Sequence, residues 1–220
     1  MKVVVIGALG KVARHLLPLL AKGGHDVVGV VRKPEQVDVV TDLGAEPLLL
    51  DVEDASTDQI ATALDGADAV VWTAGAGGGN PDRTYAVDRD AAIRSMDAAA
   101  LAGVQRYVMV SWIGSVPDHG IPEDSSFYPY ADAKLAADDH LRGTALDWTV
   151  LGPGTLTEDA PTGRIERVAE GERVPRGEAS AVPRADVAQV VVDTLREPLT
   201  VGAFVRFRSG QTPIADALRG

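Results

Sequence analysis

A glycine-containing turn lies directly between an apolar run and a helix-patterned run at the start of the chain. Residues 3–6 are Val-Val-Val-Ile, Gly7 and Gly10 follow, and leucines recur at helical spacing over residues 16–20. Gly7 can adopt backbone angles that are closed to other residues, and Gly10 has no Cβ to keep another group away from the main chain. This order predicts a buried strand, a tight turn and a helix in immediate succession.

The same turn suits an anion. The helix after it directs unpaired N–H groups and the positive end of its dipole toward the turn, and Ala13, where the usual fingerprint has a third glycine, is small enough to pack against the strand. Glycine spacing alone is weak evidence in a chain with 23 glycines, so the flanking strand and helix carry the argument. The loop predicts a pyrophosphate site for a dinucleotide. Its cofactor-binding residues are Gly7, Ala8, Leu9, Gly10, Lys11 and Val12.

Short runs rich in valine and leucine alternate with amphipathic stretches along the chain. The expected strands are residues 2–6, 26–31, 46–50, 68–73, 106–111, 147–151 and 203–208. The expected helices are residues 11–22, 34–43, 57–64, 81–102, 129–142 and 184–196. Near-continuous apolar strands indicate burial on both faces, so we expect an α/β fold with a doubly wound, mostly parallel (Rossmann) sheet. One NAD(P)-binding domain is expected over residues 1–220, with residues 152–183 as a short substrate-side excursion at the carboxyl edge.

Composition narrows the class of protein. A net charge of −11 argues against nucleic acids and anionic membranes as partners. The absence of cysteine excludes disulfides and thiol chemistry, and the four histidines show no ligand spacing, so no metal is expected. The first strand leaves no room for a signal peptide and no apolar run is long enough to cross a bilayer, which predicts a cytoplasmic location. Oligomeric state is not predicted.

The end of the second expected strand distinguishes the two common dinucleotides. An NAD site usually has Asp or Glu there for the ribose hydroxyls, whereas this chain has Arg32 and Lys33. A guanidinium can hold a phosphate through two parallel hydrogen bonds, so Arg32 is the main candidate for a 2′-phosphate, Lys33 a helper and Lys11 a weaker candidate. NADP (NADPH) is therefore the expected cofactor, with NAD possible. The alternative is that both side chains belong to a solvated turn before Pro34.

Residues after the third and fourth expected strands complete the cofactor site. Asp51, followed by Val52, is placed to meet the adenine amino group, and a structural turn carboxylate is an equal alternative. Residues 73–79 are small, which leaves space for a ribose and the pyrophosphate, although a flexible loop would have the same composition. The cofactor-binding residues expected in this run are Ala74, Gly75 and Ala76.

Tyr130-Ala131-Asp132-Ala133-Lys134 places a phenol and an ammonium on one helix face. A free tyrosine has a pKa of about 10, so acid or base work near neutrality needs the pKa lowered by roughly 3, or about 4 kcal/mol. The ammonium and the positive nicotinamide ring both favour that change. Ser111, at the end of the fifth expected strand, can hold a carbonyl oxygen. The alternative is a surface tyrosine, a ribose-binding Lys134 and a serine that only ends a strand.

The chain resembles the atypical short-chain dehydrogenase/reductases, specifically their small NAD(P)H-binding group. The likeness rests on the glycine loop, on Tyr130 and Lys134, and on residues 98–111, 145–154 and 184–188. The resemblance implies Gly7, Gly10 and Ala13 at the pyrophosphate and Arg32 at the adenosine. It also implies catalytic roles for Ser111, Tyr130 and Lys134, with Lys134 bridging to the ribose. The residues that it implies beside the nicotinamide amide are Pro153, Gly154, Thr155 and Leu156.

Three departures from the family pattern leave alternatives open. The long interval between Ser111 and Tyr130 leaves Ser115 as an alternative serine. Gly152 stands where many members have an arginine, which weakens any argument for an anionic substrate. The asparagine that often supports the active-site helix is not evident, and Asp88 lies in the corresponding stretch.

These observations favour an NADPH-dependent oxidoreductase that transfers hydride to a small carbonyl or conjugated substrate, with Tyr130 as proton donor. One alternative is a non-catalytic NADPH-binding redox sensor, because a fold does not guarantee activity. An NAD-dependent epimerase or dehydratase fits less well, because few residues follow the sixth expected strand to build a substrate region. The partner in each enzyme reading is a small molecule whose identity the sequence does not specify.

Overall fold

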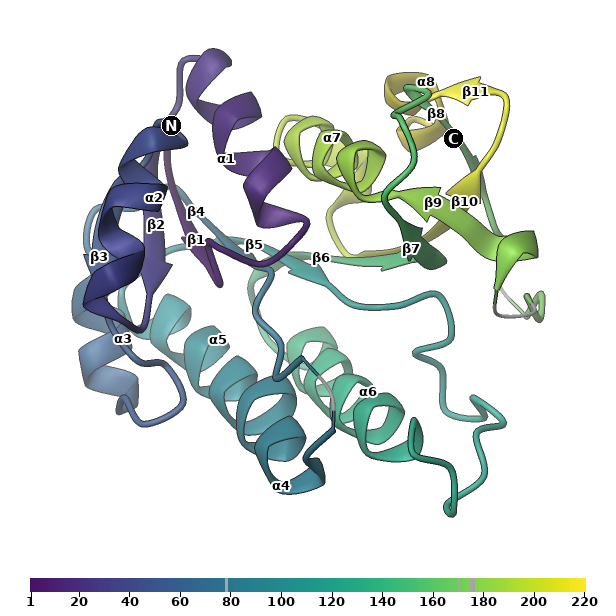
Figure 1. Ribbon diagram of the computed structural model, residues 1–220, viewed down its shortest axis with the longest axis horizontal. Coiled ribbons are helices and arrows are strands. Elements are labelled where there is room, and N and C mark those ends of the chain that lie inside the picture. The colour runs from purple at the N-terminus through teal and green to yellow at the C-terminus, as the bar shows by residue number, and fades with distance from the viewer. Residues whose placement is uncertain (78, 170, 175–176) are drawn as a thin grey trace.

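The computed structural model describes residues 1–77, 79–169, 171–174 and 177–220. Its central feature is a nine-stranded sheet in the order β11-β8-β10-β6-β5-β4-β1-β2-β3 (Figure 1). From β3 to β6 this is the strand order of a dinucleotide-binding fold, with neighbouring strands parallel. The predicted doubly wound, mostly parallel sheet is therefore confirmed. The strands are β1 (Lys2–Ile6), β2 (Asp26–Val31), β3 (Glu46–Leu49), β4 (Ala69–Trp72), β5 (Arg106–Val110), β6 (Asp147–Pro153), β7 (Thr155–Thr157), β8 (Arg164–Arg167), β9 (Ala181–Pro183), β10 (Ala203–Ser209) and β11 (Thr212–Pro213).

Helices cover both faces of the sheet, as Figure 1 shows for α1 and α7 on one side and α5 and α6 on the other. Val3 and Val5 of β1 pack with α1 and α7, whereas Val4 and Ile6 pack with α3 and α5. Alternate side chains of β1 thus pack against helices on opposite faces of the sheet. Because both faces are covered, the strand is a continuous run of valine and isoleucine. The helices are α1 (Ala13–Lys22), α2 (Val37–Asp42), α3 (Thr57–Ala63), α4 (Pro81–Thr84), α5 (Ala92–Leu101), α6 (Tyr128–Arg142), α7 (Arg184–Thr194) and α8 (Ile214–Leu218).

The expected single α-helix over residues 81–102 is wrong in one respect. Its middle, Tyr85–Ala91, is a π-helical segment that links α4 to α5. The hydrogen bonds of a π-helix span one residue more than those of an α-helix, and such segments are frequent at functional sites. The buried Asp88 lies in this segment, and its carboxylate faces the loop after β4.

The expected excursion after β6 contains regular structure that the sequence did not indicate. Within it, β7 and β9 form a small two-stranded sheet, and β8 extends the main sheet beyond β10 in antiparallel fashion. Outside the excursion, β11 pairs with β8 at the edge of the main sheet. These strands are short, so their periodicity carries little signal. A turn of 3₁₀-helix, Pro34–Gln36, likewise precedes α2 where one helix over residues 34–43 was expected.

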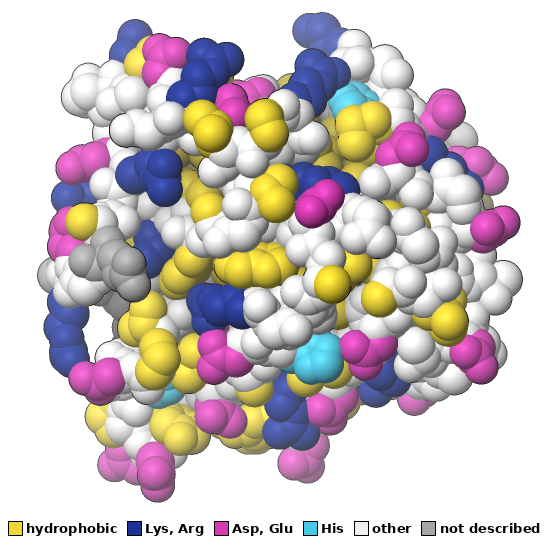
Figure 2. Space-filling model, turned by 180° about the vertical axis from the view of Figure 1, so that it is seen from behind, with side chains coloured by type: hydrophobic (Ala, Val, Ile, Leu, Met, Phe, Trp, Pro, Cys, Tyr) yellow, Lys and Arg dark blue, Asp and Glu magenta, His cyan; other side chains and the backbone are white. Residues whose placement is uncertain are grey.

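The face in Figure 2, opposite to that in Figure 1, intersperses acidic and basic side chains and gathers neither sign into one area. Within the described part of the chain, no helix is both long and apolar enough to span a membrane.

Candidate functional site

The glycine turn after β1 has the geometry that the sequence predicts. Gly7 has a φ of 87°, and a Cβ on it would lie 2.5 Å from the backbone nitrogen of Ala74. A Cβ on Gly10 would lie 3.3 Å from the carbonyl oxygen of Thr73. The two glycines therefore let the turn lie directly against the loop that follows β4.

The end of this turn presents free backbone donors. Among the described residues, the N–H groups of Lys11 and Val12 have no protein acceptor, because α1 begins only at Ala13. Donors of this kind at a helix start suit an anion. The Lys11 side chain points elsewhere, since it is 72% exposed and its ammonium lies 3.4 Å from Glu158.

A cavity of about 260 Å³ lies beside this turn at the carboxyl edge of the sheet, where the strand order reverses between β1 and β4. Ligands bind at such switch points in open α/β sheets. Lys11, Val12 and Lys33 are expected site residues that do not line the cavity, and Lys33 pairs with Glu35 at 3.8 Å. The expected residues that do line it are Gly7, Ala8, Leu9, Gly10, Arg32, Asp51, Val52, Ala74, Gly75 and Ala76. Gly78, part of the expected small-residue run, lies outside the described residues.

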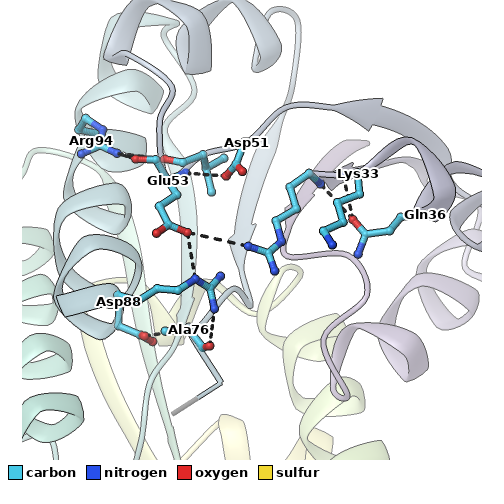
Figure 3. Close-up of polar contacts among 10 residues, drawn as sticks. Lys33, Gln36, Asp51, Glu53, Ala76, Asp88 and Arg94 are labelled. Atoms are coloured by element: carbon cyan, nitrogen blue, oxygen red, sulfur yellow. Dashed lines mark hydrogen bonds and ion pairs between the residues drawn. The ribbon is translucent and has the colours of Figure 1, made fainter. Parts of the chain in front are cut away.

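Asp51 adopts the turn geometry that was the alternative to adenine binding. Its Oδ1 accepts a hydrogen bond from the N–H of Glu53 at 3.1 Å. The loop that contains both residues is held from α5, because Arg94 donates to the carbonyl oxygens of Val52 and Glu53 at 3.0 and 2.8 Å (Figure 3). The hydrogen bond of this turn uses Oδ1 of Asp51 and not Oδ2.

Glu53 is a site residue that the sequence did not reveal. Its Oε2 lies 3.1 Å from Arg83 Nε and 3.9 Å from Arg32 Nη1, so one carboxylate oxygen faces two guanidinium groups (Figure 3). Arg83 also donates to the carbonyl oxygen of Ala76 at 2.7 Å. All three charged side chains line the first cavity.

Asp88 supports the loop after β4 from the π segment. Its Oδ2 accepts a hydrogen bond from the N–H of Ala76 at 2.9 Å, and only 2% of the residue is exposed. Burial raises the pKa of Asp88, opposed by the Lys134 ammonium, the Ala76 N–H and Arg83. The carboxylate thus accepts a backbone hydrogen bond, as an asparagine side-chain oxygen also can.

A second cavity of about 570 Å³ lies beyond β5 and β6. Aromatic rings form much of its wall: the ring of Phe127 lies 5.2 Å from that of Trp112 and 5.1 Å from that of Tyr130. Gly154 also lines the cavity and must be glycine, because a Cβ on it would overlap the carbonyl oxygen of Ser180. The expected residues that line this cavity are Ser111, Tyr130, Pro153, Gly154, Thr155 and Leu156.

Ser111 and Ser115 share one buried partner, Asp138 of α6. Their hydroxyls donate to its Oδ2 at 2.5 and 2.6 Å. Ser115 is fully buried and does not line the cavity, whereas Ser111 does. The structure thus brings Ser111, and not Ser115, to the cavity beside Tyr130.

Asp138 has no exposed surface, and its Oδ1 has no hydrogen-bond partner among the described residues. Burial raises its pKa, opposed by the Lys134 ammonium and the two serine hydroxyls. The sequence contained one signal for it: Tyr130, Lys134 and Asp138 recur every four residues, which places them along one helix face.

Lys134, an expected catalytic and cofactor-binding residue, is almost completely buried and lines neither cavity. Its Nζ donates to the carbonyl oxygen of Val110 at 3.1 Å and contacts Met109 Sδ at 3.3 Å. The expectation that this ammonium lowers the pKa of Tyr130 is wrong in this structure. Burial, with the carboxylates of Asp88 and Asp138, raises the pKa of Tyr130 well above its ordinary value of 10.0, because all three disfavour a phenolate.

The strand order, the glycine turn and the cavity at the switch point together define a Rossmann-type dinucleotide-binding protein. The chain belongs to a family described as NAD(P)H-binding, which it matches over residues 7–198. This agrees with the resemblance to atypical short-chain dehydrogenase/reductases.

Individual relatives carry both epimerase and oxidoreductase names. The chain is 36% identical to a Bacillus subtilis protein named "uncharacterized sugar epimerase YhfK", with 100% of this chain and 99% of the relative covered. A solved Bacillus halodurans structure described as a "putative NAD-dependent epimerase/dehydratase" is 33% identical, with a TM-score of 0.90 over 100% of this chain and 99% of that one. The oxidoreductase YlbE from Lactococcus lactis is 28% identical, with a TM-score of 0.84 over 100% of this chain and 95% of that one.

Proposed function

We propose that the protein is an NADPH-dependent oxidoreductase that reduces a small carbonyl or conjugated substrate. The observation that carries the proposal is that Ser111, directly after β5, and Tyr130, in α6, line the same apolar cavity as the segment Pro153 to Leu156. A hydroxyl and a phenol that line one cavity can orient a substrate oxygen and give it a proton. The family match supports the dinucleotide, and a relative named as an oxidoreductase supports the reaction class.

The first cavity offers the groups that would hold the cofactor. The glycine turn, with the N–H groups of Lys11 and Val12, receives the pyrophosphate. Arg32 meets the 2′-phosphate, which favours NADP over NAD. Lys134 would have to leave its buried contact with the Val110 carbonyl oxygen to reach the nicotinamide ribose. Bound NADPH supplies the hydride, and the chain supplies orientation and the proton.

Tyr130 acts as the proton donor. Its raised pKa keeps the phenol protonated at neutral pH but also makes it a weaker acid. Loss of that proton is favoured by the positive nicotinamide ring that hydride transfer would form. Ser111 orients the substrate oxygen by turning its hydroxyl from Asp138 toward the cavity. Asp138 keeps the hydrogen bond from Ser115 when Ser111 turns away, so its carboxylate is never left without a donor.

The walls of the second cavity favour an uncharged, partly apolar substrate. Trp112, Phe127 and Tyr130 give it aromatic surface. Arg206 lies beside Gly152 in the sheet register, but its guanidinium donates to the carbonyl oxygens of Ile113, Ala169 and Glu172. The Arg206 guanidinium is therefore occupied by backbone carbonyl oxygens. It does not replace the arginine that many family members have at the position of Gly152.

Isotope transfer tests this function. The purified protein is incubated with NADPH deuterated at the transferred position and a panel of carbonyl and quinone substrates. We expect at least one product to carry a single deuterium. Tight NADPH binding with no turnover across the panel would instead indicate the non-catalytic redox sensor.

A second candidate function is an NAD-dependent epimerase or dehydratase, which the names of two relatives favour. Such an enzyme returns the hydride to its own substrate and has no need to release the cofactor. NAD that remains bound through purification, with no net oxidation of added NADPH, would support this candidate over the reductase.

A further inference from the structure

Two arginines far apart in the chain meet one carboxylate at the adenosine end of the first cavity. Arg32 follows β2, Arg83 lies in α4, and Glu53 lies in the loop after β3. The guanidinium nitrogens lie 3.9 and 3.1 Å from the same Glu53 oxygen. Two guanidinium groups and one carboxylate together carry a net positive charge, which favours an anionic ligand.

Arg83 and Glu53 are carried by anchored backbone. Arg83 Nη1 donates to the Ala76 carbonyl, and its own N–H donates to Asn80 Oδ1 at 3.1 Å. Arg94 fixes the Glu53 backbone from α5. The Arg83 guanidinium is therefore held by contacts that do not depend on Glu53. An anion entering there would meet it already in place, with the partly exposed Arg32 side chain on its other side.

The Glu53 carboxylate is a replaceable occupant of that position. The side chains of Arg32, Arg83 and Glu53 are 43%, 32% and 26% exposed, and ion pairs that solvent reaches contribute little to stability. A phosphate dianion has more charge and more acceptor oxygens than a carboxylate, so it can engage both guanidinium groups at once. A ribose hydroxyl, by contrast, can donate a hydrogen bond to the carboxylate as it stands.

We propose that Arg83 is a second ligand for the 2′-phosphate of NADP and that Glu53 sets the choice between NADP and NAD. The 2′-phosphate takes the place of the carboxylate between Arg32 and Arg83. In NAD the free 2′-hydroxyl donates to Glu53. This inference rests on the proposed binding of a dinucleotide in the first cavity. Beyond Arg32, it assigns Arg83 as a second ligand of the 2′-phosphate and Glu53 as the group that competes with that phosphate.

Titration calorimetry with NADP+ and NAD+ tests the proposal on the intact chain. Glu53→Gln removes the competing charge and keeps the side-chain shape, so we expect NADP+ to bind about tenfold more tightly and NAD+ no more tightly. Arg83→Ala removes one ligand, so NADP+ affinity is expected to fall about tenfold or more, with less than a threefold change for NAD+.

Arg89→Ala is the matched control, because Arg89 lies in the adjoining π segment, pairs with Asp90 and does not line the cavity. It should leave the ratio of the two affinities unchanged. Arg83→Ala also removes the Ala76 contact, so 2′,5′-ADP and 5′-AMP are titrated in parallel. The loss should appear with 2′,5′-ADP and not with 5′-AMP.

The outcomes separate this inference from the proposed function. Equal changes for NADP+ and NAD+ in Glu53→Gln, or weaker NADP+ binding in that variant, would overturn the role of Glu53 and leave dinucleotide binding intact. An unchanged NADP+ affinity in Arg83→Ala would remove Arg83 as a ligand. A wild-type chain that binds neither dinucleotide would overturn both the proposed function and this inference.

Discussion

The hydroxyl of Ser111 donates its hydrogen to Asp138 Oδ2, 2.5 Å away, although Ser111 itself lines the second cavity. Ser115 donates to the same oxygen from a fully buried position. The two serines therefore make the same hydrogen bond, while only one of them meets the cavity.

This difference gives a paired test of the active serine. Ser111→Ala should lower kcat/KM by about 10-fold to 100-fold, because the substrate oxygen loses its orienting hydroxyl. Ser115→Ala removes the hydrogen bond that Asp138 keeps when Ser111 turns to the substrate, so a loss is expected that is clearly smaller than that in Ser111→Ala. Steady-state kinetics on both variants measure the contrast, and equal losses would show that Ser111 acts only through Asp138.

Tyr130→Phe tests the proton donor. Turnover should fall by about 100-fold or more, while NADPH affinity remains that of the wild type, because the phenol contributes a proton and not cofactor contacts. Tyr128→Phe, two residues earlier in α6, is the control, since Tyr128 does not line the cavity. If Tyr130→Phe turns over at the wild-type rate, Tyr130 is not the donor.

The raised pKa of Tyr130 also predicts a pH profile for reduction. A donor whose pKa lies above its ordinary value of 10.0 stays protonated across the neutral range. Through this group alone, reduction should therefore show no loss of kcat between about pH 7 and about pH 9. A fall in kcat in that range that disappears in Tyr130→Phe would contradict a raised pKa at Tyr130.

Asp138 predicts a pH dependence of stability. Burial raises its pKa in the folded chain above the ordinary value of 3.8, so the folded state binds the proton more tightly than the unfolded state. The contribution of this group to the free energy of unfolding is then fully present below that value and decreases as pH rises through the folded pKa. Asp138→Asn removes the titration and keeps the shape.

Chemical denaturation of wild type and Asp138→Asn measures this effect. The stability of the variant relative to the wild type should increase as pH rises from about 4 to about 7. Other acids with raised pKa values, such as Asp88, titrate in both proteins and cancel in the comparison. A difference that is constant or that decreases with pH would show that burial does not dominate at Asp138.

The sequence was sufficient for the sheet and for the glycine turn because both are local patterns. Continuous valine runs specify buried parallel strands, and ends of the seven expected strands agree with the structure within two residues. The turn is likewise recognisable because its glycines adjoin the strand that they end.

The polar contacts of the site could not be predicted in the same way, because they join residues distant in the chain. Glu53 and Arg83 lie 30 residues apart, and Ser111 and Asp138 lie 27 apart. Both contacts depend on where loops end at the carboxyl edge, which composition does not specify. The π segment that carries Asp88 likewise has no signal in helix propensity.

The central claim is that the Gly7 turn binds the pyrophosphate of a dinucleotide, and Gly7→Ala tests it against a matched glycine. Gly24 has a similar φ of 77°, but a Cβ there would meet nothing within 4 Å, whereas a Cβ on Gly7 would overlap Ala74. Titration calorimetry with NADPH should show saturable binding to the wild type and to Gly24→Ala and a large loss of affinity in folded Gly7→Ala. No heat from the folded wild-type chain with NADPH, NADP+, NADH or NAD+ would contradict the account.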